Sequence, residues 1–295
     1  MNNDLEKTLD GKVSRRDFAA LSVAAGLSAT AGATPASALA VTESDVTIKT
    51  PDGVCDAAYY RPTAGKHPAV LIWTDVFGLR PTFRDMGKRL AAEGYAVLVP
   101  NPFYRTQKAP VMEDASKVDF NDPGFRAQMQ SWTGPINEAG AIERDAAAHI
   151  AFLDAQKEVD ATRKIGTQGY CMGGPLVFKT VAAVSSRVGA GATFHGGGLV
   201  TDKPDSPHLL IPKFKARMYI AVAASDDNRQ PDAKDKLKEA FAAAHVPGDV
   251  ELYAGTIHGW CVRDMPMQDG KPIYNKPDAE RAWGKLEALY KTTLA

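Results

Sequence analysis

One cysteine lies in the part of the sequence that is best suited to covalent chemistry. Cys171 is the third residue of the run GYCMGG at 169–174. Glycines around it permit a turn that Cβ atoms would obstruct, and a strand–turn–helix elbow of this kind lifts one side chain above a sheet. The helix N-terminus behind it stabilises a negatively charged sulfur. We therefore predict that Cys171 is a nucleophile, the alternative being an unreactive buried cysteine in a glycine-rich turn.

An acid and a base that suit this cysteine follow it in the chain. Asp226 and Asp227 come after a predicted strand at 218–223, and His258 lies in the run GTIHGW at 255–260. Nucleophile, acid and histidine appear in this order in α/β-hydrolases. The histidine moves a proton near neutral pH, an aspartate orients it, and the thiolate attacks an acyl carbon. These residue types leave both aspartates open as the acid.

The other histidines offer one further candidate. His195 ends a predicted strand at 188–194, so we expect it near the pocket, either as a substrate contact or as a hydrogen-bonded structural residue. Neither the cysteines nor the histidines form pairs with the spacing of zinc ligands. The sequence therefore predicts no metal site and no cofactor.

Apolar periodicity predicts the elements that position these residues. The predicted strands are 45–50, 54–60, 69–73, 95–100, 163–168, 188–194, 218–223 and 250–253, and the predicted helices are 82–93, 141–153, 175–184, 233–244 and 278–290. This alternation predicts an α/β protein with the α/β-hydrolase fold, a single doubly wound, mostly parallel sheet with helices on both faces. Sites in such sheets lie at the carboxyl ends of the strands.

One long segment has no clear period. Residues 101–139 contain four prolines, at 102, 110, 123 and 135. A loop of this length inside a compact domain is usually functional. We expect it to cover the site, and whether it moves as a lid is open.

Composition excludes several classes of partner. Lysine plus arginine and aspartate plus glutamate each number 35 in 295 residues, so no excess charge favours nucleic acid or an acidic membrane surface. Hydrophobic residues make up 44% and charged residues 24%, which is ordinary for a soluble globular protein. Three cysteines do not make a disulfide framework. If Cys171 is a nucleophile, only Cys55 and Cys261 are left to pair.

The first forty residues have the features of an export signal. Arg15 and Arg16 form a twin-arginine pair, an uncharged Ala-rich run follows at 19–30, and small residues at 36–40 suit a signal peptidase. We predict cleavage after Ala40, export of the folded chain to the periplasm by the twin-arginine machinery, and a mature domain at 41–295. No later stretch is long and apolar enough to span a membrane.

Over residues 45–290 the sequence resembles the dienelactone hydrolase family. The run at 169–174 is similar to that family's elbow, which carries cysteine rather than serine. The run TDVFG at 74–78 is similar to the stretch in which the family carries an acidic residue that contacts the resting nucleophile. The resemblance thus implies that Asp75 modulates the nucleophile. It also implies that the backbone N–H groups of Val76 and Met172 form an oxyanion hole.

The same resemblance bears on the substrate and on the acid. It implies that Arg105 binds a substrate carboxylate, and Arg263 stands one residue from the place of a second such arginine. Strand alignment with the family favours Asp226 as the acid. The family's proline four residues after its acid favours Asp227, because the proline here is Pro231. We favour Asp226 by a narrow margin.

The resemblance implies a hydrolase of a lactone or carboxylic ester, similar to carboxymethylenebutenolidase, that works through a Cys–Asp–His triad and a thioester acyl-enzyme. Its expected partner is a small ester or lactone, which can be anionic. Two alternatives remain open: an acyltransferase or thioesterase with the same triad, and a non-catalytic binding protein of the same fold. The physiological substrate and the oligomeric state are not determined by the sequence.

Overall fold

An eight-stranded sheet forms the centre of the protein. The computed structural model describes residues 38–268 and 270–294. In sheet order the strands are β1 (Val41–Thr50), β2 (Gly53–Pro62), β4 (Ala96–Pro100), β3 (Ala69–Trp73), β5 (Ile165–Tyr170), β6 (Val188–Phe194), β7 (Arg217–Ala223) and β8 (Gly248–Tyr253). The β1–β2 and β2–β4 pairs are antiparallel, and all later pairs are parallel. The predicted fold class is confirmed.

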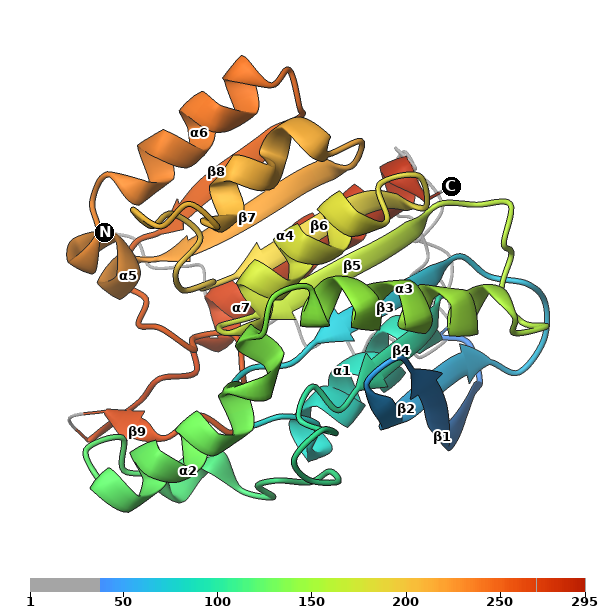
Figure 1. Ribbon diagram of the computed structural model, residues 1–295, viewed down its shortest axis with the longest axis horizontal. Coiled ribbons are helices and arrows are strands. Elements are labelled where there is room, and N and C mark those ends of the chain that lie inside the picture. The colour runs from blue at the N-terminus through green and yellow to red at the C-terminus, as the bar shows by residue number, and fades with distance from the viewer. Residues whose placement is uncertain (1–37, 269, 295) are drawn as a thin grey trace, which may run out of the picture. The chain divides into compact units, whose positions relative to one another are not determined.

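Helices cover both faces of this sheet. They are α1 (Pro81–Ala92), α2 (Pro123–Thr133), α3 (Ala141–Asp154), α4 (Gly173–Ala183), α5 (Ala224–Arg229), α6 (Ala233–Ala243) and α7 (Lys276–Thr293), with 3-10 helices at Ala115–Lys117, Pro135–Asn137 and Pro207–Lys213. Helices α3, α4 and α6 lie in front of the sheet in Figure 1, and α1 and α7 lie behind it. A two-stranded hairpin, β9 (Met267–Gln268) and β10 (Lys271–Pro272), lies apart from the main sheet.

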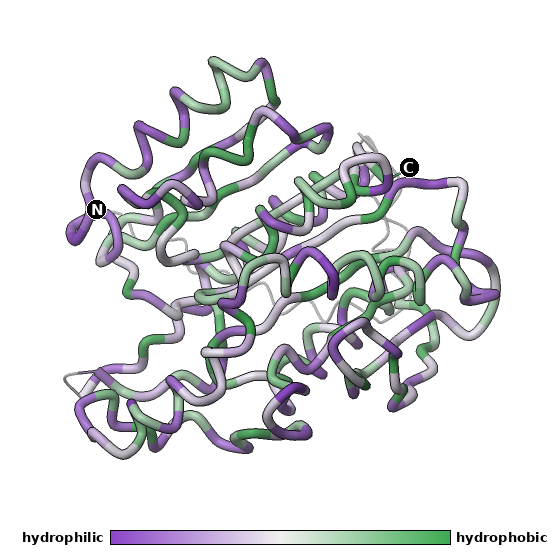
Figure 2. Tube along the Cα trace, in the orientation of Figure 1, coloured by the Kyte–Doolittle hydropathy of each residue, from purple (hydrophilic) through white to green (hydrophobic). Residues whose placement is uncertain are grey.

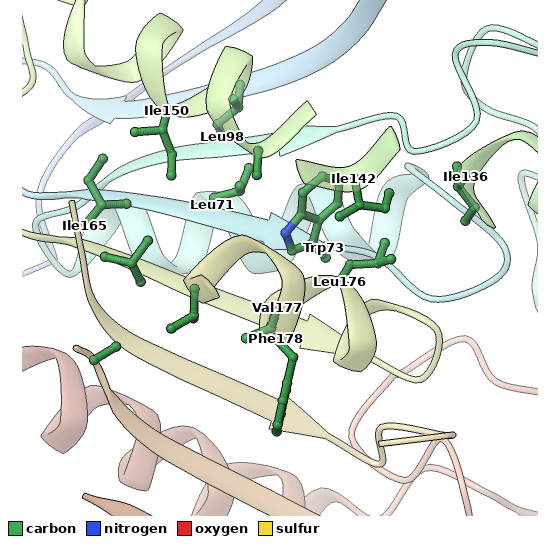
Figure 3. Packing of buried hydrophobic residues seen from close by; sticks show 14 of the residues in the cluster. Leu71, Trp73, Leu98, Ile136, Ile142, Ile150, Ile165, Leu176, Val177 and Phe178 are labelled. Atoms are coloured by element: carbon green, nitrogen blue, oxygen red, sulfur yellow. The ribbon is translucent and has the colours of Figure 1, made fainter. Parts of the chain in front are cut away.

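The core is divided into two layers by the sheet. Every residue of β3 is buried, and alternate side chains point to opposite faces, as the strand period requires. Leu71 and Trp73 join the layer beneath α3 and α4, whereas Val70 and Ile72 join the layer beneath α1 and α7. Figure 3 shows Trp73 packed near Val177 of α4. This double burial holds the carboxyl ends of the central strands in place.

Surface helices show how hydropathy follows burial. Helix α6 buries only Leu237 and Phe241, four residues apart on one stripe, and the rest of the helix is polar or small. The tube in Figure 2 shows this change of colour along the helix and the hydrophobic strands beneath it. Helix α6 thus closes one end of the sheet through a narrow contact.

Two predicted elements are displaced along the sequence. The strand predicted at 163–168 is β5 at Ile165–Tyr170, and the helix predicted from 175 begins at Gly173. The turn that carries Cys171 is therefore shorter than the pattern indicated. Glycine is a poor helix former in isolation, so propensity placed the helix start two residues late.

The segment 101–139 is more ordered than predicted. It contains helix α2, in which the Asp122 side chain accepts a hydrogen bond from the Gly124 N–H at 2.9 Å and Pro123 occupies the first turn. Only Phe125 and Trp132 of this helix are buried. Two apolar residues seven apart make too weak a period to detect, so the prediction of an irregular loop was wrong at this point.

The ends of β7 and β8 also hold structure that the pattern did not predict. Asp226 and Asp227 lie in the first turn of the short helix α5 rather than in an extended loop. The β9–β10 hairpin follows the histidine loop. Neither α5 nor the two-residue strands of this hairpin carry the buried apolar run that marks β3 and β4, so sequence patterns did not reveal them.

Three observations concern the chain as a whole. Cys55 and Cys261 are buried free thiols, so the pairing that the sequence left open is not formed. None of the described helices is both long enough and apolar enough to cross a bilayer. The predicted signal lies outside the described residues, apart from positions 38–40, and residues from Ala38 onward form one compact unit.

Candidate active site

Cys171 lies in a strained turn between β5 and α4. The strand ends at Tyr170 and the helix begins at Gly173, so only two residues make the turn. Cys171 has a φ of 52°, in the left-handed region that side chains other than glycine rarely adopt. Its N–H donates a hydrogen bond to the Phe194 carbonyl at 3.1 Å. The turn therefore holds this half-buried cysteine at the carboxyl ends of β5 and β6.

The glycines of the turn permit close packing of backbone on backbone. A Cβ at Gly169 would lie 2.2 Å from the Gly173 carbonyl oxygen. One at Gly173 would lie 2.6 Å from the carbonyl oxygen of Trp73, and one at Gly174 would lie 2.7 Å from Cα of Gly196. Real Cβ atoms do not approach so closely, so any side chain here would move the cysteine. The predicted elbow is thus present, and the reason for its glycines is steric.

His258 is oriented by Asp226. Nδ1 of His258 lies 2.8 Å from Oδ2 and 3.0 Å from Oδ1 of Asp226. The His258 N–H donates to Oγ of Ser225 at 2.8 Å, and the Ser225 N–H donates to the Thr256 carbonyl at 3.2 Å. Helix α5 and the histidine loop are therefore bonded together. With Nδ1 occupied by a carboxylate, Nε2 is left to exchange protons.

The neighbouring aspartate makes a different contact. Asp227 forms an ion pair with Lys234 of α6 at 2.8 Å. Asp226, besides His258, has Arg229 as an ion-pair partner at 3.6 Å. The geometry therefore favours Asp226 over Asp227 as the partner of the histidine, because adjacent residues of a helix point in different directions.

The charge state of His258 follows from three neighbouring influences. Burial disfavours the imidazolium, but negative charge on Cys171 and the hydrogen bond to Asp226 outweigh it and raise the pKa of His258 to about 10. Only 24% of this side chain is exposed. At neutral pH the raised pKa of His258 therefore favours its imidazolium form.

His195 lies behind the histidine of this pair. Its ring centre is 4.8 Å from that of His258, with the two planes inclined at 68°. Burial, with the nearby charge of His258, lowers the pKa of His195 well below its usual value, so its ring is neutral. Within the described residues neither of its ring nitrogens has a hydrogen-bond partner. His195 thus packs against the back of His258, and its predicted contact with substrate stays a prediction.

The backbone N–H groups of Val76 and Met172 are the predicted oxyanion hole. Within residues 38–268 and 270–294, neither Val76 nor Met172 donates a hydrogen bond from its main chain. The turn around Val76 is held from both sides, because the Phe77 N–H donates to Oδ1 of Asp75 at 2.9 Å and the Gly78 N–H donates to the Asp75 carbonyl at 3.0 Å. Donors without a partner are what an oxyanion hole needs, and the predicted role of these two groups stays a prediction.

Asp75 belongs to a buried ion cluster, which we call the Arg80 cluster and define as Asp75, Arg80 and Asp264. The Arg80 guanidinium donates to both oxygens of Asp75, at 2.6 and 2.9 Å, and to both oxygens of Asp264, at 2.7 and 2.8 Å. In the described chain no hydrogen bond joins Asp75 to Cys171. Its predicted effect on the nucleophile stays a prediction, and Arg80 and Asp264 were missed because 184 residues separate them.

The Arg80 cluster carries two carboxylates for one guanidinium. Complete burial raises the pKa of Asp75, and the charge of Asp264 acts in the same direction, against the opposing effect of Arg80. The cluster joins the turn that carries the Val76 N–H to the chain six residues after His258. It therefore ties the free backbone donor to the histidine loop.

The predicted carboxylate-binding arginines lie elsewhere. Arg105 donates to both oxygens of Asp145, each at 2.8 Å, and to Asp52 at 2.6 Å. Arg263 lines a separate cavity of about 110 Å³ between α1 and α7, together with Glu280. Neither arginine is among the described residues that line the pocket at His258, so their roles in substrate binding stay predictions.

A pocket of about 630 Å³ opens beside His258. Its walls come from the segment before α2, from α5 and the histidine loop, and from the chain around β9. The lining residues are Val118, Asp119, Phe120, Asn121, Ser225, Arg229, Ile257, His258, Met265, Pro266, Met267, Gln268 and Ile273. Among the residues that the structure describes, no cluster of three or more His, Cys, Asp or Glu side chains could hold a metal ion.

Sequence comparison extends these observations to known proteins. Residues 55–294 match the profile of the dienelactone hydrolase family. A Synechocystis sp. protein named "Putative carboxymethylenebutenolidase" is 25% identical over 233 residues, covering 78% of this chain and 88% of that protein. The "Carboxymethylenebutenolidase" of Rhodococcus opacus is 24% identical over 201 residues, covering 66% and 71%.

Solved structures with the same fold give a consistent result. A structure titled as a "Putative Dienelactone Hydrolase" from Klebsiella pneumoniae has a TM-score of 0.70 at 20% identity, covering 85% of this chain and 99% of that one. A dienelactone hydrolase-like promiscuous phosphotriesterase from metagenomic libraries has a TM-score of 0.69 at 20% identity, covering 87% and 100%. With the elbow, the His258–Asp226 pair and a family match over 55–294, the chain belongs to the dienelactone hydrolase family and is a hydrolase.

Proposed function

We propose that the protein hydrolyses a lactone or carboxylic ester with Cys171 as nucleophile, Asp226 and His258 as its partners, and a thioester acyl-enzyme as intermediate. The observation that carries the proposal is the pair of hydrogen bonds from His258 Nδ1 to Asp226, made beside an elbow whose backbone strain exposes one cysteine. The names of the relatives and the pocket at His258 agree with an ester substrate.

Acylation uses the imidazolium and the free N–H groups. The Cys171 sulfur attacks the carbonyl carbon, and the carbonyl oxygen takes up negative charge between the N–H groups of Val76 and Met172. As the C–O bond breaks, His258 gives its proton from Nε2 to the leaving oxygen. In a lactone this oxygen remains attached to the acyl chain. The product is a thioester on Cys171 and a neutral His258.

Deacylation returns the site to its first state. The neutral His258 takes a proton from water as the water oxygen attacks the thioester carbon. The C–S bond then breaks, the thiolate leaves, and the imidazolium that remains is stabilised by Asp226. Each proton that leaves His258 in the first half is replaced in the second, so no external reagent is needed.

The two adjacent aspartates allow a matched test. Asp226→Asn should lower kcat/KM for p-nitrophenyl acetate by about 10³–10⁴-fold, because an amide supports the wrong tautomer of His258. Asp227→Asn removes the same charge from the same helix but breaks only the ion pair to Lys234, so most activity should remain. Equal losses in both variants would contradict the assignment.

The intermediate separates hydrolysis from the alternatives. Rapid quench and mass spectrometry should detect an acyl group on Cys171, and Cys171→Ala should abolish both the adduct and turnover. Cys55→Ala, at a buried free thiol outside the site, is the control. Transfer of the acyl group to an added thiol or alcohol in preference to water would indicate an acyltransferase. Ligand binding without turnover would indicate a binding protein.

We also propose that residues 1–40 direct export to the periplasm by the twin-arginine route. The support is the Arg15–Arg16 pair and the uncharged run after it. Fractionation of cells should show a shortened periplasmic protein from the full chain and an unprocessed cytoplasmic protein from Arg15→Lys/Arg16→Lys. Identical processing of both chains would contradict export by this route.

A further inference from the structure

The pocket at His258 has an apolar wall that the hydrolytic mechanism does not require. Seven of its lining residues are apolar and come from two regions far apart in the sequence, 118–120 and 257–273. They are Val118, Phe120, Ile257, Met265, Pro266, Met267 and Ile273. Pockets that bind organic ligands are lined mainly by such side chains, with a few polar groups that fix the orientation.

Two of these side chains are unusually exposed. Phe120 is 41% exposed and Met267 is 58% exposed, although both line the pocket. Phe120 is held in place by Phe77 and Phe125, whose ring centres lie 5.7 and 5.8 Å from its own. A fixed aromatic ring and a flexible thioether that face water beside a catalytic histidine form a surface that a ligand can cover.

The charges of the pocket are already balanced by neighbours. Two described cations line it, the imidazolium of His258 and the guanidinium of Arg229, and both have Asp226 as an ion-pair partner, at 2.8 and 3.6 Å. The other ionised lining residue, Asp119, is negative and would repel an anion. A substrate carboxylate would therefore have to compete with Asp226 for each cation of the wall and would be repelled by Asp119.

We propose that this pocket receives an uncharged, apolar acyl group of several carbon atoms, and that Phe120 and Met267 determine this selectivity. The inference rests on the proposed ester hydrolysis and names its substrate class. A volume of about 630 Å³ is in the range of roughly 300–1,000 Å³ that is usual for small-molecule pockets. Contact of the acyl chain with the wall buries apolar surface in the acylation transition state as well as in the bound ester.

A series of p-nitrophenyl esters with two, four, six and eight acyl carbons tests the proposal. Each buried methylene should raise kcat/KM by about threefold to fourfold until the pocket is full. The mono-p-nitrophenyl ester of adipic acid, which has six acyl carbons and ends in a carboxylate, should react more slowly than the neutral hexanoate. A flat or falling series, or a preference for the anionic ester, would overturn the inference, whereas absence of turnover on every ester would refute the proposed function itself.

Paired variants locate the selectivity. Phe120→Ser and Met267→Ser should each reduce the ratio of kcat/KM for the hexanoate to that for the acetate by about tenfold, chiefly through a higher KM for the hexanoate. Leu209→Ser is the matched control, because Leu209 is also 53% exposed but does not line the pocket. A similar change of ratio in Leu209→Ser, or no change in either pocket variant, would overturn the proposal.

Discussion

Two arginines in this protein make nearly the same contacts in very different surroundings. In the Arg80 cluster a guanidinium is bound between Asp75 and Asp264, and Arg80 is 1% exposed. We define the Arg105 cluster as Asp52, Arg105 and Asp145. Here too a guanidinium is bound between two aspartates, and the Arg105 side chain is 9% exposed. Arginine suits both because its planar fork matches two carboxylates at once.

The difference lies in what each cluster connects. The Arg80 cluster joins the turn that carries the Val76 N–H to the segment after His258, and both lie at the proposed site. The Arg105 cluster joins the β1–β2 turn, through Asp52, to helix α3, through Asp145. The same ion-pair chemistry therefore connects the proposed catalytic groups in one place and holds an edge hairpin in the other.

Removal of Arg80 should have the largest effect. Arg80→Met leaves the buried carboxylate of Asp75 and the partly exposed one of Asp264 without their shared partner, so the free energy of unfolding should fall by about 3–5 kcal/mol. The turn at Val76 also loses its tie to the histidine loop, and kcat/KM should fall by about 10²-fold or more, mainly through kcat. Urea denaturation and steady-state kinetics with p-nitrophenyl acetate measure the two quantities.

A second variant guards against simple loss of folding. Arg80→Lys keeps the charge but cannot bind both carboxylates with a fork, so it should recover part of the stability and little of the activity. If Arg80→Lys restores kcat/KM together with stability, the cluster does not position the oxyanion turn.

Removal of Arg105 should cost less and act on stability alone. Arg105→Met should lower the free energy of unfolding by about 1–3 kcal/mol, because Asp145 is buried and Asp52 keeps a second partner in Arg144. We expect kcat/KM for a neutral ester to change by less than about threefold. Selective loss of activity on an anionic ester in Arg105→Met would instead support the carboxylate-binding role that the family resemblance implies.

Alkaline pH should distinguish the catalytic histidine from both arginines. The pKa of His258 is raised to about 10, so its charged form stabilises the fold fully below the ordinary value near 6.5 and loses that effect as the pH rises through about 10. Arg80 and Arg105 keep their charge throughout, because their carboxylate partners raise their pKa further despite burial. Chemical denaturation between pH 6 and 10.5 should therefore show a decline that Cys171→Ala reduces, and an identical decline in both proteins would contradict the ion-pair interpretation.

Acid pH should produce the smallest effect, with opposite signs in the two clusters. Hydrogen bonds from Arg144 and Arg105 lower the pKa of Asp52 in the folded protein. The ionised Asp52 therefore stabilises the fold fully above pH 3.8, and this stabilisation is lost as the pH falls through the pKa of the folded state. Burial raises the pKa of Asp75 in the folded protein above its ordinary value of 3.8. As the pH rises from 3.8 to the pKa of the folded state, the carboxyl ionises more readily in the unfolded chain, so the protein loses stability over that range. Differences in unfolding free energy between wild type and Asp52→Asn or Asp75→Asn should therefore change with pH in opposite directions. Parallel curves would contradict the distinction by burial.

Much of the fold could be predicted from local patterns. Strand β6 occupies the predicted residues 188–194, and the buried runs of β3 and β4 were placed within one residue. Helix α2 and the β9–β10 hairpin were not predicted. Strands β3, β4 and β6 are mostly buried and apolar, which local patterns reveal. Helix α2 and the hairpin depend on a few contacts with distant residues.

The sequence by itself determined the fold class and the order of Cys171, the two aspartates and His258. Both follow from local rules, because a tight turn needs glycines close to the cysteine and a site residue directly follows a predicted strand. Residues close together in the sequence are enough to recognise each of these features. Only the tertiary structure decided that Asp226 rather than Asp227 meets His258, that Arg80 binds Asp264, and that the pocket wall is apolar. These features depend on side chains that lie up to 184 residues apart in the chain, and local sequence carries no record of such distances.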